Sequence, residues 1–404
     1  MAHVPGTVTL NDEVAHTEDV TAGLKHGTGR NAHIILAPQP SEDPNDPLNW
    51  SWIKKEYILW ILLFGSILNA ATNGPFLNAS YVVISQDVNH SLNEVVLVSG
   101  YNLLAAGASG PIWCALSRRY GKRPCFLAST LLDIIGTAVG EAGVSYEYLL
   151  AARIIQGFST SAYESLIVAA VGDLYFVHER GLRIAIINWI LNSVSCLTSI
   201  ILGQVTAGLG WRWLFHMFQI FLVVQFILNV LFCPETTYIR DALYNLDQNK
   251  DENLEELVNV EHRHDHRGDV EIGNGEAALK ETTTQTSRFS QPVPKKKTFV
   301  QELAVYTGVY NRDNILKYIA GPFITLLNPA ALYCTITSGL LNAWYVGTAI
   351  IAAGIFSSPP YNMGPSGIAN IGIGPFIGGL IGSTVIAVTS DPVAKWLTRL
   401  NKGI

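Results

Sequence analysis

An arginine inside a long apolar segment is the first feature of this chain that could do chemistry. Arg153 lies within residues 149–158, among leucine, alanine and isoleucine side chains. A guanidinium at the centre of a membrane helix costs about 2.5–3.5 kcal/mol on insertion scales, so it usually faces a bundle interior or a wet cavity. Its position predicts a part in moving something through a membrane.

Polar residues recur at helical spacing on the same segment. Steps of three and four residues place five side chains on one helical stripe, namely Arg153, Gln156, Thr160, Tyr163 and Glu164. Arg153 and Glu164 are separated by about 16 Å along a helix, so they cannot pair directly. We expect this stripe to line a cavity, with a carboxylate able to exchange protons. The alternative is that these groups satisfy one another and hold the bundle together.

Further polar residues interrupt other apolar segments. Asp133 is a third charge in an apolar segment and is expected mainly as a structural partner. Several amides also occur in such segments, and the pair Asn69 and Asn73 precedes Gly74-Pro75. A bent helix end beside two amides suits a binding cavity, and interhelical hydrogen bonding is an equally good account. These additional candidates for a substrate or proton pathway are Asp133, Asn69, Asn73, Tyr101, Asn102, Asn188 and Asn192.

The elements that must position these residues are membrane-spanning helices. Crossing a hydrocarbon core of about 30 Å takes roughly 20 apolar residues, and helix satisfies the backbone within one segment. The sequence therefore predicts an all-α membrane protein of eight spans, at about 57–78, 94–116, 124–143, 148–171, 182–207, 212–232, 328–356 and 366–389.

Basic residues in alternate loops predict the orientation. Lysine and arginine gather before the first span, between spans 2 and 3, between spans 4 and 5, and after span 8, whereas the other loops carry only Arg212. The positive-inside rule then places both termini in the cytoplasm. On the opposite side, the sequons at Asn78 and Asn89 are predicted glycosylation sites.

Composition excludes several other functions. Of 404 residues, 49% are hydrophobic and only 14% are charged, against about 25% charged in soluble proteins. A basic nucleic-acid footprint is absent. The five cysteines form no CxxC pair, so we expect neither a metal nor a disulfide, and no cofactor. Enzymatic motifs are also absent, so the chain is not expected to be an enzyme.

Four regions follow along the chain. Residues 1–50 are polar and expected to be a disordered cytoplasmic terminus, and residues 51–235 hold six spans. Residues 236–327 are expected to form a cytoplasmic linker, in which the lysine run 295–297 is interpreted as a solvated, lipid-facing charge cluster. Residues 328–404 hold two further spans and a basic tail.

Several motifs together resemble the major facilitator superfamily, most closely the fungal members of its drug:proton antiporter branch. They cover about residues 44–404 and include Arg153-x-x-Gln156-Gly157, Ser117–Pro124, Gly210–Trp213, Pro234–Arg240 and Asn370–Pro375. The resemblance implies a proton-coupling role for the span 4 arginine. It also implies a gating role for the loop between spans 2 and 3, with Arg118, Arg119, Gly121, Lys122 and Arg123.

The chain departs from the family pattern at three places. Arg118 stands where the loop motif has an aspartate, and Cys114 where it has a glycine. Thr198-Ser199 and Leu202-Gly203 stand where the antiporter motif has Gly-Pro and Gly-Gly. The family fold has two six-helix halves, with the site between them, and here the second half holds two predicted spans.

Two functional hypotheses follow. The first is a secondary transporter in the plasma or vacuolar membrane that exports small amphipathic molecules by alternating access, coupled to protons. Uptake of a nutrient or sugar is the less favoured direction. The second is a truncated, transport-inactive protein or incomplete gene model, which could act by pairing with a partner chain. The partners expected in the first case are the lipid bilayer and a small-molecule substrate.

Overall fold

The structure is a bundle of long helices. The computed structural model describes residues 36, 38–41, 43–73, 76–143, 145–239, 295–311 and 314–400. Within these residues the regular elements are helical and no strand occurs, which confirms the predicted all-α class.

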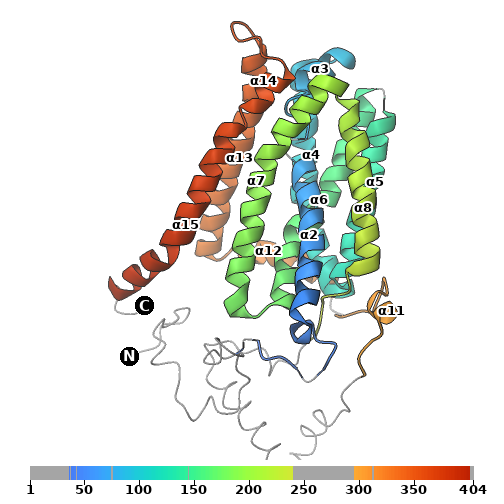
Figure 1. Cartoon of the computed structure of the whole chain (residues 1–404), viewed down its shortest axis with the longest axis vertical. Coiled ribbons are helices and arrows are strands. Elements are labelled where there is room, and N and C mark those ends of the chain that lie inside the picture. Colours follow the sequence, from blue (N-terminus) through green and yellow to red (C-terminus); the bar gives the residue numbers. More distant parts are fainter. Residues whose placement is uncertain are drawn as a thin grey trace, which may run out of the picture.

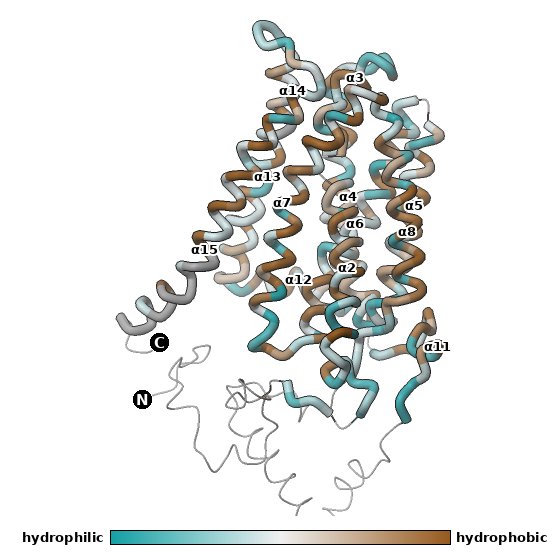
Figure 2. The backbone as a smooth tube through the Cα atoms, in the orientation of Figure 1, coloured by the Kyte–Doolittle hydropathy of each residue, from teal (hydrophilic) through white to brown (hydrophobic). Residues whose placement is uncertain are grey.

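Six long helices form the first bundle, with the short helix α3 (Tyr81–Asp87) at one end (Figure 1). They are α2 (Trp52–Asn73), α4 (Leu92–Tyr120), α5 (Lys122–Ala142), α6 (Tyr146–Leu174), α7 (Val177–Leu209) and α8 (Arg212–Phe232). Apolar residues dominate the lengths of these helices and hydrophilic residues gather toward their ends (Figure 2). This distribution is what a bilayer requires of spanning elements.

Local sequence explains where several helices begin and end. Ser91 and Glu94 form a capping box at the start of α4, because each side chain accepts a hydrogen bond from the other residue's backbone N–H. Gly121 and Gly210 adopt φ angles of +94° and +91°. Glycine alone adopts this region freely, so α4 turns into α5, and α7 into α8, within one or two residues.

Helix α6 is the centre of the first bundle, because it packs against α2, α4 and α5. Two apolar cores lie along the bundle. One includes Ile58, Phe126 and Leu166, and the other includes Phe76 and Phe215. A residue on the inward face of α6 is therefore enclosed by protein on several sides.

The second part of the chain lies against α7 and α4. Its helices are α11 (Phe299–Glu302), α12 (Ile315–Thr325), α13 (Pro329–Ser357), α14 (Pro365–Asn370) and α15 (Ile373–Leu400). Helices α14 and α15 contact α7, and α12 contacts α4 at the opposite end of the bundle (Figure 1). Ser366 Oγ donates to Gln204 Oε1 at 2.8 Å across the α7–α14 contact.

Six helices of the described residues are long and apolar enough to cross a membrane. They are α4, α5, α6, α7, α8 and the joined segment Pro365–Ile386, and α12 with Pro329–Thr348 makes a seventh if that pair, bent by 83°, is one span. Helix α2 is not among them, although it lies along the bundle (Figure 1). The count of eight spans therefore stays a prediction.

Two regions are more structured than the sequence suggested. Within the terminus expected to be disordered, Pro47–Asn49 form a short 3-10 helix, because the Asp46 side chain caps the N–H of Leu48 at 3.0 Å. Within the predicted linker 236–327, α12 is an apolar helix that packs on α4. Residues 1–35 and 240–294 lie outside the described part of the chain.

The contact between α7 and α14 depends on Gly203. A Cβ atom at this position would lie 2.2 Å from the Ala369 Cβ and 3.1 Å from the Pro365 carbonyl oxygen. We expect Gly203→Ala to destabilise the attachment of the second part by about 1–3 kcal/mol, the usual cost of overpacking. Gly208→Ala on the same helix meets nothing within 4 Å and is the control. Equal thermal unfolding of both variants in detergent would contradict this close approach.

Candidate functional site

Arg153 is enclosed between α4, α5 and the segment that follows α2. The residue is fully buried, and its Nη1 donates to Gln156 Oε1 at 2.9 Å. Gln156 Nε2 in turn donates to Thr137 Oγ1 on α5 at 2.9 Å. The guanidinium lies 5.4 Å from the centre of the Phe76 ring, within the range of a cation–π interaction.

Asp133 on α5 is the charged partner of this arginine. It is fully buried, and the two opposite charges interact electrostatically. The two side chains do not form a direct ion pair, because no nitrogen of Arg153 lies within 4.0 Å of an Asp133 carboxylate oxygen. Both Asp133 carboxylate oxygens, and Nε and Nη2 of Arg153, lack hydrogen-bond partners among the described residues.

These residues form what we call the buried charge cluster: Arg153, Asp133, Gln156, Asn102 and Thr137. Asn102 on α4 joins it through Nδ2, which donates to the Arg153 carbonyl at 2.8 Å. Buried polar atoms are nearly always hydrogen-bonded, to protein or to water, and leaving one unpaired is costly. The unpaired atoms of Arg153 and Asp133 therefore mark a place where water or a proton could be held.

The polar stripe of α6 does not lie as the sequence suggested. Arg153, Gln156, Thr160 and Tyr163 are fully buried, and Glu164 is exposed. The four buried residues face the interior of the first bundle, where Tyr163 OH accepts from Asn229 Nδ2 at 2.6 Å. The expectation that Glu164 shares one face with these four residues was wrong, because Glu164 lies on an exposed side of α6 while α2, α4 and α5 pack around the rest. Their role in lining a cavity stays a prediction.

The remaining amide candidates are scattered. Asn69 is buried and donates to the Gly65 carbonyl of its own helix at 2.8 Å. Asn192 donates to the Asn188 carbonyl at 2.9 Å, and both residues are exposed, as is Tyr101. The Asn73 side chain and Gly74-Pro75 lie outside the described part of the chain. The structure thus places Asn102 next to Arg153, whereas Tyr101, Asn188 and Asn192 are exposed and do not join it.

The predicted gating loop is held by a carboxylate from another part of the chain. The backbone N–H groups of Lys122 and Arg123 donate to Glu235 at 2.9 and 3.1 Å. A carboxylate is favourable there because a helix N-terminus carries partial positive charge. A Cβ atom on Gly121 would lie 2.3 Å from Glu235 Oε2, so the close approach requires glycine.

The basic side chains of this loop bind three different segments. Lys122 pairs with Asp173 at the end of α6. Arg123 donates to the carbonyls of Val230 and Leu303, both at 2.9 Å. These contacts join α5 to the end of α8 and to the segment beside α11.

The second part of the chain also contacts this loop. The Arg118 guanidinium lies 5.7 Å from the Tyr318 ring of α12. The Arg119 carbonyl accepts from the Tyr310 N–H at 2.9 Å. The loop is therefore a junction between the first bundle and the segments that follow it.

Two acidic residues of this junction were missed by reasoning from the sequence. Glu235 was noted only within the motif Pro234–Arg240, and Asp173 was not singled out. One signal in the sequence could have pointed to them: Arg118 stands where the family loop has an aspartate, so the basic loop lacks an acidic partner of its own. Identifying Glu235 required knowing that the chain after α8 returns to the start of α5.

A pocket lies between the two parts of the chain. Its volume is about 300 Å³, and α7, α13, α14 and α15 contribute most of its lining. Tyr345 OH lies 3.4 Å from Cys196 Sγ across it. The lining mixes hydroxyl and apolar groups: Asn78, Ser195, Cys196, Ser199, Tyr345, Val346, Thr348, Ala352, Ile368, Ile371, Gly372 and Pro375.

The two predicted glycosylation sites differ in accessibility. Asn89 is exposed. Asn78 accepts a hydrogen bond from Tyr81 OH at 3.0 Å, and Ser80 of its sequon is 1% exposed and lies 2.7 Å from Thr206 Oγ1. A glycan on Asn78 would have to replace its hydrogen bond with Tyr81, and both glycosylation sites stay predictions.

Comparison with known proteins adds to this geometry. The family model of the Major Facilitator Superfamily matches residues 59–403. An uncharacterised MFS-type transporter of Schizosaccharomyces pombe is 24% identical over 415 residues, covering 99% of this chain and 71% of that protein. The MFS antiporter QDR3 of Candida albicans is 28% identical, over 53% of this chain and 30% of that protein. The efflux pump dotC of Dothistroma septosporum is 29% identical, over 40% of this chain and 27% of that protein.

Solved structures give a weaker likeness. A peptide transporter POT in complex with alafosfalin has a TM-score of 0.46 at 11% identity, covering 90% of this chain and 70% of that chain. The proton:xylose symporter XylE has a TM-score of 0.40 at 15% identity, covering 77% of this chain and 70% of that chain.

Proposed function

Since the chain belongs to the major facilitator superfamily, we propose that it exports small amphipathic molecules by alternating access, coupled to protons. The observation that carries the coupling is the buried pair Arg153 and Asp133, with four hydrogen-bonding atoms unpaired among the described residues. A carboxylate near an arginine in a low-dielectric interior is strongly attracted to it. A proton on Asp133 would abolish this attraction.

Such a change would act on helix packing. Arg153 and Asp133 lie on adjacent helices, α6 and α5, which contact each other along their length. Loss of the charge attraction would favour a different spacing of these helices. Protonation and helix arrangement would then be linked, as coupled transport requires.

The pocket between α7 and the second part is the proposed substrate site. Its hydroxyl groups and the Tyr345 ring could orient a small molecule, while Ile368, Ile371 and Pro375 offer apolar contact. Because α7 belongs to the first bundle and α13–α15 to the second part, movement of one against the other would open or close it. The relatives named efflux pump and antiporter support export over uptake.

The location and orientation belong to the same proposal. The chain is a multi-pass integral membrane protein, and we place it in the plasma membrane with both termini in the cytoplasm, following the loop charges. Asn89 is then outside the cell and is the more exposed of the two predicted glycosylation sites.

Proton movement in reconstituted vesicles tests the coupling. The full chain would be placed in lipid vesicles with a pH-sensitive dye inside, and an amphipathic cationic dye would be added as substrate. We expect substrate addition to move protons, and Arg153→Ala to abolish this movement. Substrate transport without proton movement would contradict coupling. Absence of any substrate transport would instead support the second hypothesis, an inactive chain.

A further inference from the structure

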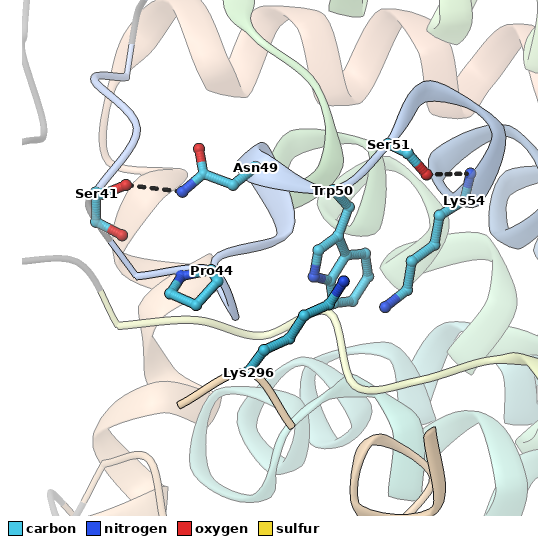
Figure 3. A pocket seen from close by; sticks show the side chains of 7 residues that line it. All are labelled: Ser41, Pro44, Asn49, Trp50, Ser51, Lys54 and Lys296. Carbon is cyan, nitrogen blue, oxygen red and sulfur yellow. Dashed lines mark hydrogen bonds between the residues drawn. The ribbon is translucent and has the colours of Figure 1, made fainter. Parts of the chain in front are cut away.

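A second pocket lies at the end of α2 that carries the N-terminal segment, away from the proposed substrate site. Its volume is about 440 Å³. Three parts of the chain build it: the segment before α2, the first turn of α2 and the residues before α11 (Figure 3). Its lining is Ser41, Pro44, Asn49, Trp50, Ser51, Lys54 and Lys296.

Lys296 is held in this pocket by bonds on both sides of it. Asn45 Nδ2 donates to the Lys295 carbonyl at 3.2 Å, and Asn45 Oδ1 accepts from the Lys297 N–H at 2.8 Å. The backbone at Lys296 is thus tied to the N-terminal segment. Its side chain reaches toward the Trp50 ring (Figure 3). The ammonium has no hydrogen-bond or ion-pair partner among the described residues.

Lys54 adds a second ammonium to the lining of the pocket. Its Nζ lies 3.9 Å from the centre of the Trp50 ring and 2.6 Å from Glu302 Oε2. The Trp50 indole N–H is buried and has no partner among the described residues. Two lysine side chains therefore line one pocket, and the carboxylate nearest to them, Glu302, is already paired with Lys54.

Asp43 and Asp46, the acidic residues that the structure describes in the segment before α2, are engaged elsewhere. Asp46 accepts from the N–H groups of Ser41 and Leu48. Asp43 accepts from the N–H and side chain of Asn45. Neither side chain lines the pocket. The lysine end of the pocket is therefore positively charged and rich in donors.

The neighbouring residues indicate the depth of this pocket relative to a bilayer. Trp52 and Ile53, at the start of α2, are 65% and 71% exposed. Exposed tryptophans are typical of the layer of lipid headgroups. The run Lys295–Lys297 is also exposed, and lysine clusters at this level are attracted to anionic lipids.

We propose that this pocket binds a phosphate monoester group, carried by an anionic phospholipid headgroup at the membrane surface. Lys296 would contact the phosphate oxygens, Lys54 would share its charge between the phosphate and Glu302, and the Trp50 ring would form the wall beside them. The volume leaves room for a ring attached to the phosphate. Phosphate binding at this pocket is independent of what the protein transports.

Titration of the full chain with soluble ligands tests the site. The protein in detergent micelles would be titrated calorimetrically with dioctanoyl phosphatidylinositol 4-phosphate, with inositol 1,4-bisphosphate and with inorganic phosphate. We expect saturable binding of the lipid, weakened about fivefold by Lys296→Gln, the value that a lysine contributes near an anionic surface. Lys295→Gln removes the same charge from the adjacent residue, outside the pocket lining, and should change binding less than twofold.

The outcomes separate the possible sources of the phosphate. Tighter binding of the lipid than of inositol 1,4-bisphosphate supports a membrane headgroup. Equal binding of the two, with the same loss in Lys296→Gln, retains the phosphate site but overturns its lipid source. An equal loss in both lysine variants indicates diffuse attraction and overturns the site, as does the absence of saturable binding by all three ligands.

Discussion

Asp133→Asn is expected to destabilise the folded bundle by about 3 kcal/mol or more, although asparagine has nearly the same size and shape as aspartate. Removing one partner of a buried charge pair typically costs about 3–5 kcal/mol, because the other charge stays buried and uncompensated. The arginine cannot lose its proton. Unfolding of the purified protein by titration with a denaturing detergent, followed by circular dichroism, measures the change.

The double variant distinguishes charge pairing from simple loss of packing. Arg153→Met removes the cation and keeps much of the apolar volume, and it leaves Asp133, which can become neutral by binding a proton. We therefore expect Arg153→Met to be less damaging than Asp133→Asn. In the double variant the free energy of unfolding should recover by about 1–3 kcal/mol relative to the sum of the single changes. Strict additivity would show that these two charges do not interact.

Gly157→Ala is expected to have the second large effect, because it separates α4 from α6. A Cβ atom at this position would lie 2.2 Å from the Asn102 carbonyl oxygen and 2.9 Å from its carbonyl carbon. These are backbone atoms, so no flexible side chain can move aside. We expect a loss of about 1–3 kcal/mol or more in the free energy of unfolding.

The same substitution should disturb the buried charge cluster. The Asn102 side chain donates to the Arg153 carbonyl at 2.8 Å, and Trp113 Nε1 donates to the Phe158 carbonyl at 2.8 Å. Both bonds cross the α4–α6 contact on either side of Gly157. Gly172→Ala on α6 meets nothing within 4 Å and should be neutral or mildly stabilising, since alanine favours helix over glycine by about 1 kcal/mol. Similar thermal unfolding of the two variants would contradict the close packing.

The helices could be predicted from the sequence because each depends on a local requirement. A long apolar segment in lipid must satisfy its own backbone, so the predicted bounds 212–232 and 124–143 lie close to α8 (Arg212–Phe232) and α5 (Lys122–Ala142). The span after the linker was harder. Helix α12 precedes α13 at a bend of 83°. Local hydropathy does not distinguish one bent span from two separate helices.

The site was predicted in type but not in arrangement. Arg153, Gln156 and Asp133 were singled out because charged and amide groups are costly in an apolar segment. Periodicity then placed Glu164 on the same stripe as Arg153, yet one is exposed and the other fully buried. Periodicity gives an angle around the helix, and burial depends on which neighbours cover that angle at each level.

The sequence by itself determined that this chain is built from apolar helices, that basic loops alternate along it, and that Arg153 needs an enclosed polar environment. Only the tertiary structure decided what encloses it. Asp133 faces Arg153 because α5 packs on α6, and Glu235 holds the start of α5 because the chain returns there after α8. The pocket at Lys296 likewise needs Asn45, some 250 residues earlier in the chain. Local propensity is set by neighbours in the sequence, whereas a charge's partner is set by helices that meet in space.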